Sequence, residues 1–237
     1  MAEEEPVFET TTGPPRIITA ASLFDGHDAA INVMRRLIQS AGAEVIHLGH
    51  DQSAKAVVDC AIQEDAHGVA LTSYQGGHVE YFTYIRQLLD EAGCEHIRIF
   101  GGGGGTITPP EIKTLHESGI SKIYSPDDGR TMGLMGMIHH LMGIASEIDL
   151  IDSDRIASLS GPVTPEDTAK VGLLLTMSES ADDKTFKSTL DKCRSSEKEV
   201  PVIGFTGTGG AGKSSLLDEL MLILSLIHIS EPTRRVF

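Results

Sequence analysis

The chain has 237 residues, 40% of them hydrophobic, so it can form one full domain and part of a second. Its formal net charge of −15 argues against a nucleic-acid binder, because phosphate contacts need clustered lysine and arginine side chains. The three cysteines (Cys60, Cys94 and Cys193) form no CxxC pair, which disfavours a disulfide scaffold or a zinc site and favours a cytoplasmic protein. No signal-peptide pattern is present and the longest apolar run, 221–229, is too short to span a bilayer, so we expect no membrane contact.

The first part of the chain alternates short β-branched runs with helical patterns. Residues 1–15 are acidic and then rich in threonine and proline, which predicts a flexible leader. Between residues 16 and 143, the expected strands are 16–21, 44–48, 68–72, 96–100 and 121–124, and the expected helices are 29–40, 53–64, 79–92, 109–117 and 129–143. Five successive βα units predict an α/β fold, a doubly wound five-stranded parallel sheet with strand order 2-1-3-4-5.

The composition changes beyond residue 143. Residues 144–199 are polar and helical in pattern, and we interpret them as a helical linker with no chemistry of its own. A strand is expected at 200–205, and 200–223 is interpreted as the start of a truncated P-loop domain. Residues 224–237 resemble translated adapter sequence and are expected to be a non-native tail, the alternative being a genuine helix.

An Asp-x-His loop follows the first expected strand. It comprises Asp25, Gly26, His27 and Asp28, and helical sequence begins directly after it. Parallel α/β sheets bind ligands at the carboxyl ends of their strands. The Asp25 carboxylate can accept the second ring N–H of His27, as the partners of metal-bound histidines do. The alternative is a loop histidine that is simply hydrogen-bonded to its neighbour.

Three more loops fall at the same sheet edge, after the third, fourth and fifth strands. Their candidate residues are Thr72, Ser73, Tyr74, Gly76, Gly77, His78, Gly101, Gly102, Gly103 and Ser125. Five consecutive glycines, 101–105, indicate a backbone that lies against a bulky ligand, or alternatively a flexible loop. The hydroxyls of Thr72 and Ser73 could hydrogen-bond a polar atom of that ligand. Glycine loops beside a histidine suit a large flat metal complex better than a dinucleotide.

These motifs resemble the D-x-H-x-x-G, S-x-L and G-G signatures of cobalamin-binding domains of the base-off, histidine-on type, over residues 16–142. The resemblance implies that His27 is the lower axial ligand of cobalt and that Asp25 orients it. It also implies that Thr72, Ser73 and Gly101–Gly103 line a channel for the displaced nucleotide tail. The chain departs from the pattern at Ala30, where the motif has glycine, and at Tyr74, where it has leucine, which puts the wall of the site in doubt.

A second motif, Gly207-x-x-x-x-Gly212-Lys213-Ser214, is a full Walker A sequence. Backbone N–H groups here can wrap a phosphate, Lys213 can reach its oxygens, and Ser214 can bind Mg²⁺. The candidate nucleotide-binding residues are Gly209, Gly210, Ala211, Gly212, Lys213, Ser214 and Ser215. A Walker B aspartate and a guanine-reading loop do not fit in the residues that remain.

A cobalamin domain followed by a P-loop resembles the fused isobutyryl-CoA mutase family, in which a cobalamin domain, a G-protein chaperone and a mutase barrel share one chain. The resemblance implies adenosylcobalamin as cofactor, radical interconversion of isobutyryl-CoA and n-butyryl-CoA, GTP and Mg²⁺ for cofactor loading, and a homodimer. The barrel that would bind the acyl-CoA is absent, so we expect no catalytic residue here, cobalamin binding without turnover, and poor nucleotide binding. The alternatives are a methylcobalamin carrier for methyl transfer and a cofactor-free flavodoxin-like regulatory module.

Overall fold

The computed structural model describes residues 6–164, 166–194 and 203–234, and side chains as far as residue 224. Contacts within the chain divide it into two units, Met1–Ser196 and Glu197–Phe237. Within the described residues, every helix is too short or too polar to cross a lipid bilayer.

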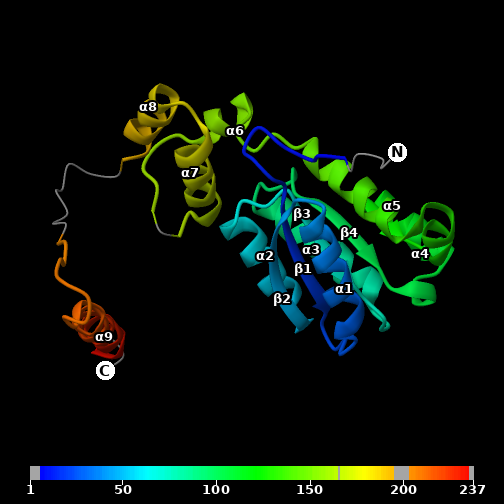
Figure 1. Ribbon diagram of the computed structural model, residues 1–237, viewed down its shortest axis with the longest axis horizontal. Coiled ribbons are helices and arrows are strands. Elements are labelled where there is room, and N and C mark those ends of the chain that lie inside the picture. Colours follow the sequence, from blue (N-terminus) through cyan, green and yellow to red (C-terminus); the bar gives the residue numbers. More distant parts are fainter. Residues whose placement is uncertain (1–5, 165, 195–202, 235–237) are drawn as a thin grey trace. The chain divides into compact units, whose positions relative to one another are not determined.

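The first unit is built on a five-stranded parallel sheet (Figure 1). Its strands are β1 (Arg16–Ser22), β2 (Glu44–Gln52), β3 (Gly68–Thr72), β4 (Arg98–Gly102) and β5 (Lys122–Tyr124). They pair in the order β2-β1-β3-β4-β5, which confirms the predicted topology. The fourth strand begins two residues later than expected, because the N–H of Ile97 closes a turn onto the carbonyl of Cys94 at 3.1 Å.

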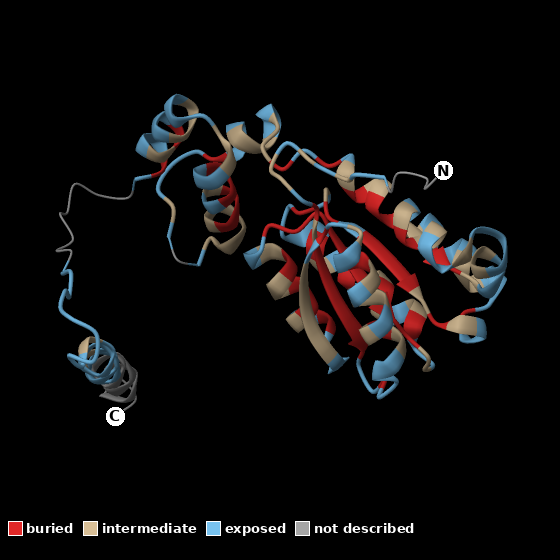
Figure 2. Ribbon diagram, in the orientation of Figure 1, coloured by how far each residue is buried: buried red, intermediate tan, exposed pale blue. Residues whose placement is uncertain are grey.

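Helices cover both faces of this sheet, and Figure 2 shows the buried strands between them. One face packs against α1 (Asp28–Ser40) and α5 (Pro126–Ser146). The other packs against α2 (Ala54–Gln63), α3 (His78–Glu91) and α4 (Pro109–Glu117), with a short 3-10 helix η1 (Gly104–Thr106) after β4.

Capping residues explain where two of these helices begin. The hydroxyl of Ser53 accepts the N–H of Ala56 at the start of α2, and Ser125 forms a capping box with Asp128 at the start of α5. This box starts α5 three residues before the expected position of 129.

The segment predicted as a linker, 144–199, is helical, as expected, in the part that the structure describes. It contains α6 (Ser153–Ser158), α7 (Thr168–Ser180) and α8 (Asp183–Cys193), which share a small apolar cluster of their own. The helix α7 packs closely on α2, since a Cβ atom at Gly172 would lie 2.9 Å from the carbonyl oxygen of Ile62. This part of the predicted linker therefore lies against the sheet domain and does not stand apart from it. The boundary placed at residue 143 stays a prediction.

The second unit contains one helix, α9 (Lys213–Arg234), among its described residues. Residues 200–202 of the expected strand lie outside the described residues, and 203–205 form no strand, contrary to the prediction. A strand needs a partner for its backbone hydrogen bonds, and the described residues of this unit offer none. The helix runs on through residue 224, and the origin of the last residues stays a prediction.

Candidate functional site

The loop between β1 and α1 holds His27 against a buried carboxylate. Asp25 has a fully buried side chain, and its Oδ1 lies 2.8 Å from Nδ1 and 2.9 Å from the backbone N of His27. An ionised carboxylate only accepts hydrogen bonds, so Nδ1 carries the ring proton and donates it. Nε2 of the neutral imidazole then keeps its lone pair, and the side chain of His27 is 69% exposed. This geometry suits a metal ligand oriented by its neighbour.

The second oxygen of Asp25 reaches another loop. Its Oδ2 accepts the backbone N–H of Tyr74 at 2.7 Å. Burial opposes ionisation of Asp25, but the hydrogen bonds from the N–H groups of Tyr74 and His27 outweigh burial and lower its pKa. The ring of Tyr74 also lies 5.5 Å from that of His27, centroid to centroid. One carboxylate thus fixes both aromatic residues.

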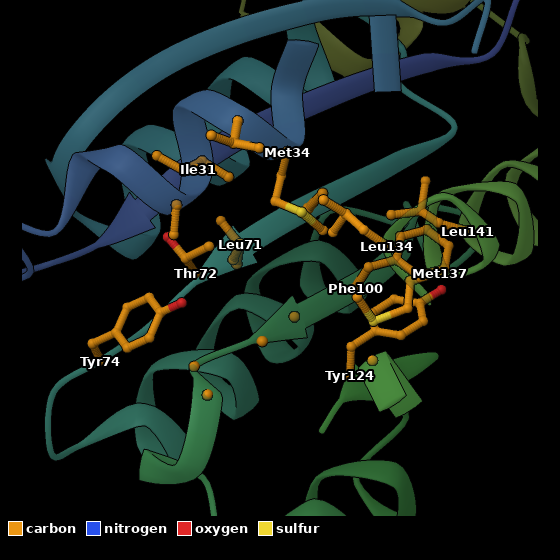
Figure 3. Close-up of a pocket in the computed structure, with 18 of the residues that line it drawn as sticks. Ile31, Met34, Leu71, Thr72, Tyr74, Phe100, Tyr124, Leu134, Met137 and Leu141 are labelled. Atoms are coloured by element: carbon orange, nitrogen blue, oxygen red, sulfur yellow. The ribbon is translucent and has the colours of Figure 1, made fainter. Parts of the chain in front are cut away.

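Tyr74 borders a cavity of about 580 Å³ between α1, the carboxyl ends of β3, β4 and β5, and α5 (Figure 3). The cavity is largely apolar. Its side-chain wall includes Ala29, Ala30, Ile31, Met34, Leu71, Thr72, Tyr74, Phe100, Tyr124, Leu134, Met137 and Leu141. Figure 3 shows the labelled side chains among these converging on the cavity from the sheet and from the helices α1 and α5 on one of its faces.

The two hydroxyls predicted to face a ligand point to different places. Thr72 lines the cavity, and its buried Oγ1 has no hydrogen-bond partner among the described residues. Ser73 does not line the cavity, and its buried Oγ accepts the hydroxyl of Ser22 at 2.8 Å. An unpartnered buried hydroxyl costs free energy, so the Thr72 group is poised for a polar atom of a ligand.

Packing within the protein, and not only a bound ligand, explains why some positions after β4 are glycine. A Cβ atom at Gly101 would lie 2.5 Å from the ring of Phe82, and one at Gly103 would lie 1.9 Å from the carbonyl oxygen of Ser73. At Gly102, on the opposite face of the strand from Gly101, a Cβ atom would meet only the carbonyl of Tyr124, at 3.4 Å. Gly102 is therefore the position where a missing side chain widens the cavity.

Most of the remaining predicted residues lie around the cavity without lining it, and Ser125 is the exception. Gly26, Asp28, Gly76 and Gly77 do not line the cavity. His78 is buried. Its Nδ1 lies 2.9 Å from the carbonyl of Gln75 and its Nε2 lies 3.3 Å from Oε2 of Glu111, so it connects the loop after β3 to α4.

Ser125 does line the cavity, and its hydroxyl donates to Oδ2 of Asp128 at 2.7 Å within the helix cap.

Sequence reasoning missed the apolar wall that α1 and α5 contribute. The helical spacing of Ile31 and Met34 in α1 could have indicated it. The α5 side could not be found in this way, because α5 is interrupted at Gly133, with φ 68° and ψ 174°. The interruption changes the face that Leu134 and Met137 present, and only glycine adopts this conformation readily.

The Walker A residues of the second unit form an exposed loop before α9. The Nζ of Lys213 donates to the carbonyls of Gly207 at 2.9 Å and Thr208 at 2.8 Å. Gly210 and Gly212 have positive φ values of 76° and 77°. Ser214 and Ser215 lie in the first turn of the helix.

Comparisons with known proteins agree with the fold and the site of the first unit. The family model of the B12 binding domain matches residues 15–123. The chain is 52% identical over 232 residues to a fused isobutyryl-CoA mutase of Cupriavidus metallidurans, and 49% identical over 213 residues to one of Geobacillus kaustophilus. These alignments cover 93% and 87% of this chain, but only 21% and 19% of the relatives. The chain therefore spans about a fifth of their length.

A shorter relative is covered over most of its length. The 2-hydroxyisobutanoyl-CoA mutase small subunit of Aquincola tertiaricarbonis is 34% identical over 115 residues, which are 48% of this chain and 82% of the relative. The aligned stretch is about the size of the sheet domain that carries the Asp25–His27 pair and the cavity. The chain therefore belongs to the family of B12-binding domains found in acyl-CoA mutases.

Proposed function

We propose that this chain is the cofactor-holding part of an acyl-CoA mutase and that it binds cobalamin through His27, with the nucleotide tail in the apolar cavity. The observation that carries the proposal is the hydrogen bond of 2.8 Å between Nδ1 of His27 and the buried Asp25. It leaves Nε2 as the donor atom for cobalt. The imidazole would then replace the base of the cofactor's own tail.

The residues of the cavity fit such a tail. The volume of about 580 Å³ and the apolar walls suit a flat aromatic base. The unpartnered hydroxyl of Thr72 offers the base a hydrogen bond, and Gly102 contributes no side chain that would fill the space. Ala30 and Tyr74, the two departures from the family motif, both border the cavity without closing it.

Each residue has a physical task in this proposal. The carboxylate of Asp25 holds the proton on Nδ1 and so prevents the imidazole from turning its N–H toward the metal. The Asp25–Tyr74 hydrogen bond keeps the loops after β1 and β3 together. The bound cofactor would supply a cobalt–carbon bond that breaks homolytically, and the chain described here would hold and orient it.

Spectroscopy of the reduced cobalt(II) cofactor bound to the protein tests the assignment of His27. Protein labelled with ¹⁵N in its histidines should change the nitrogen splitting of the electron paramagnetic resonance signal, and His27→Ala should abolish that change. The matched control is His50→Ala, which removes an exposed histidine of β2. If the nitrogen splitting were the same with and without the ¹⁵N label, no histidine of the protein would be a ligand of the cobalt.

For the full-length protein we propose adenosylcobalamin as the cofactor form and an acyl-CoA, such as isobutyryl-CoA, as the substrate. Support comes from the names of the fused relatives and from the extent of the alignment. The acyl-CoA would bind to parts beyond this chain. Adding a separately produced mutase barrel to this chain and adenosylcobalamin should restore isomerisation, whereas methyl transfer in that assay would favour a methyl carrier.

We also propose that the Walker A loop binds GTP and Mg²⁺ in the full-length protein. The chemistry is that of backbone N–H groups around a phosphate, with Lys213 on its oxygens and Ser214 on the metal. In the present chain Lys213 is bound to the carbonyls of its own loop, and the loop is exposed. We therefore expect weak nucleotide binding and no hydrolysis by this chain, which calorimetric titration with GTP and a phosphate-release assay can check.

A further inference from the structure

Tyr74 occupies a position between the metal-side histidine and the cavity. Its backbone N–H is held by Oδ2 of Asp25 at 2.7 Å, and its ring lies 5.5 Å from the ring of His27. On the other side, the ring packs close to Gly104, where a Cβ atom would lie 3.2 Å from Cε1 of the tyrosine. The ring is therefore positioned by contacts on two sides and by its backbone.

The hydroxyl end of this ring is turned toward the cavity (Figure 3). Among the described residues the phenol oxygen has no hydrogen-bond partner. The family motif has leucine at this position, an apolar side chain that could not donate a hydrogen bond. The hydroxyls of Tyr124 and Ser125 in the cavity wall are already bonded to His140 and Asp128, so Thr72 and Tyr74 supply its two hydroxyls that have no partner among the described residues.

We propose that Tyr74 is a specificity-determining residue, whose hydroxyl donates a hydrogen bond to a polar atom of the nucleotide tail. This inference rests on the proposed cobalamin site and extends it from cofactor binding to the choice among corrinoids. The consequence is selection for corrinoids that carry a complete tail over tailless ones such as cobinamide. His27 would contribute to binding both kinds, whereas Thr72 and Tyr74 would contribute only to the complete kind.

The variant Tyr74→Phe removes the hydroxyl and keeps the ring. A net hydrogen bond corresponds to a change of about 3- to 10-fold in a binding constant, so we expect the Kd for cobalamin to rise by about that factor. The Kd for cobinamide should stay at the wild-type value, because that ligand places nothing in the cavity. Absorbance titration of the apoprotein with each corrinoid gives the two constants and their ratio. Tyr84→Phe, at an exposed position on α3, is the matched control.

Each outcome of this experiment is decisive. A rise in the ratio of the cobalamin Kd to the cobinamide Kd that occurs in Tyr74→Phe and not in Tyr84→Phe supports the proposal. Equal losses of affinity for both corrinoids would assign Tyr74 a structural role, and unchanged Kd values for both would show that its hydroxyl does not contact the tail. If the wild-type protein bound neither corrinoid, the cobalamin site itself would be overturned, and the specificity proposal with it. If it bound both with equal affinity, only the specificity proposal would fail.

Discussion

The buried carboxylate of Asp25 joins the loop after β1 to the loop after β3, because its Oδ2 accepts the backbone N–H of Tyr74 at 2.7 Å. Its Oδ1 meanwhile accepts both N–H groups of His27. One side chain therefore sets the distance between the proposed metal ligand and the wall of the cavity. Such a group cannot be replaced by an amide, which has only one accepting atom.

We expect Asp25→Asn to reduce the free energy of unfolding by about 1–3 kcal/mol, because one buried N–H loses its acceptor. Cobalamin affinity should fall as well, since the imidazole is no longer held in one tautomer. Asp51→Asn is the control, because Asp51 also accepts a backbone N–H, from Phe24 at 2.7 Å, but is exposed. Urea unfolding and absorbance titration measure the two effects, and equal effects from both substitutions would contradict the special role of Asp25.

The pH dependence of Asp25 follows from its lowered pKa. A carboxyl whose pKa is lower in the folded state stabilises the protein fully above its unfolded pKa, about 3.9, and this contribution is lost as the pH falls further. The stability difference between wild type and Asp25→Asn should therefore be constant near neutral pH and shrink in acid below about pH 4.

Thr72→Val tests the unpartnered hydroxyl of the cavity. Valine has nearly the same shape, and the lost hydroxyl has no partner within the described protein, so the free energy of unfolding of the apoprotein should stay the same or rise. Cobalamin affinity should nevertheless fall by about 3- to 10-fold, because the tail loses a hydrogen bond. Ser73→Ala is the comparison, since Ser73 bonds Ser22 and not the cavity. A valine variant that binds cobalamin like wild type would remove Thr72 from the site.

Gly103→Ala should be severely destabilising, because the new methyl group would lie 1.9 Å from the carbonyl oxygen of Ser73. The loops after β3 and β4 would have to separate, and we expect a loss of at least about 2 kcal/mol. Gly105→Ala is the matched control two residues away, where a Cβ atom meets nothing within 4 Å. Thermal unfolding distinguishes the two, and similar melting temperatures would show that the loops part easily.

Much of the fold follows from the sequence, because each strand and helix of the sheet domain carries its own local pattern. The order of the strands follows from right-handed crossovers, and the Asp25–His27 pair from a spacing of two residues. The function of the glycine run could not be read in the same way. The side chains excluded by Gly101 and Gly103 are those that would strike Phe82 and Ser73, which are distant in sequence.

Two other features were beyond sequence reasoning for a related reason. The part of the cavity wall that α5 forms depends on one residue, Gly133, at which an otherwise regular helix is interrupted. One contact between the helices α6–α8 and the sheet domain joins Asp65 and Arg155, which are ninety residues apart. Each is a tertiary contact or a local dihedral angle, and neither leaves a periodic signal.

The pair formed by Asp65 and Arg155 leads to a prediction about that attachment. Nη2 of Arg155 lies 2.6 Å from Oδ1 of Asp65, whose side chain is 4% exposed, and Nη1 donates to the carbonyl of Leu150. Arg155→Met would leave a buried carboxylate without its main counter-ion, at a cost of about 3–5 kcal/mol.

Adding Asp65→Asn to Arg155→Met should recover part of the lost stability, because the uncompensated charge is then removed. Arg130→Met, which breaks an exposed pair with Asp127, should cost no more than about 1 kcal/mol. Urea unfolding of wild type, Arg155→Met, Asp65→Asn and the double variant gives the coupling between the two residues. Simple additivity of the two single changes would show that the pair does not hold the segment.

His67 makes the stability of the sheet domain depend on pH at values above those at which carboxyl groups titrate. The side chain is fully buried, and its Nδ1 accepts the backbone N–H of Arg16 at 2.9 Å. Burial, followed by the positive charge of Arg16, lowers the pKa of His67 to about 4. Other charged groups nearby act in both directions, since Asp65 raises this pKa and Arg155 lowers it.

Between the unfolded pKa of about 6.5 and the folded value, the unfolded chain binds a proton that the folded protein does not. The free energy of unfolding should therefore decrease as the pH falls through this window, by about 1.4 kcal/mol per pH unit for this one proton. His67→Asn keeps an acceptor near the position of Nδ1 and removes the titrating ring. In this variant the free energy of unfolding should therefore change less steeply with pH, by about 1.4 kcal/mol per pH unit. Urea unfolding at several values between about pH 7 and pH 5 measures the slopes. His50→Asn controls for the loss of a histidine at the surface, and a slope in His67→Asn equal to that of wild type would mean that His67 is protonated in the folded protein.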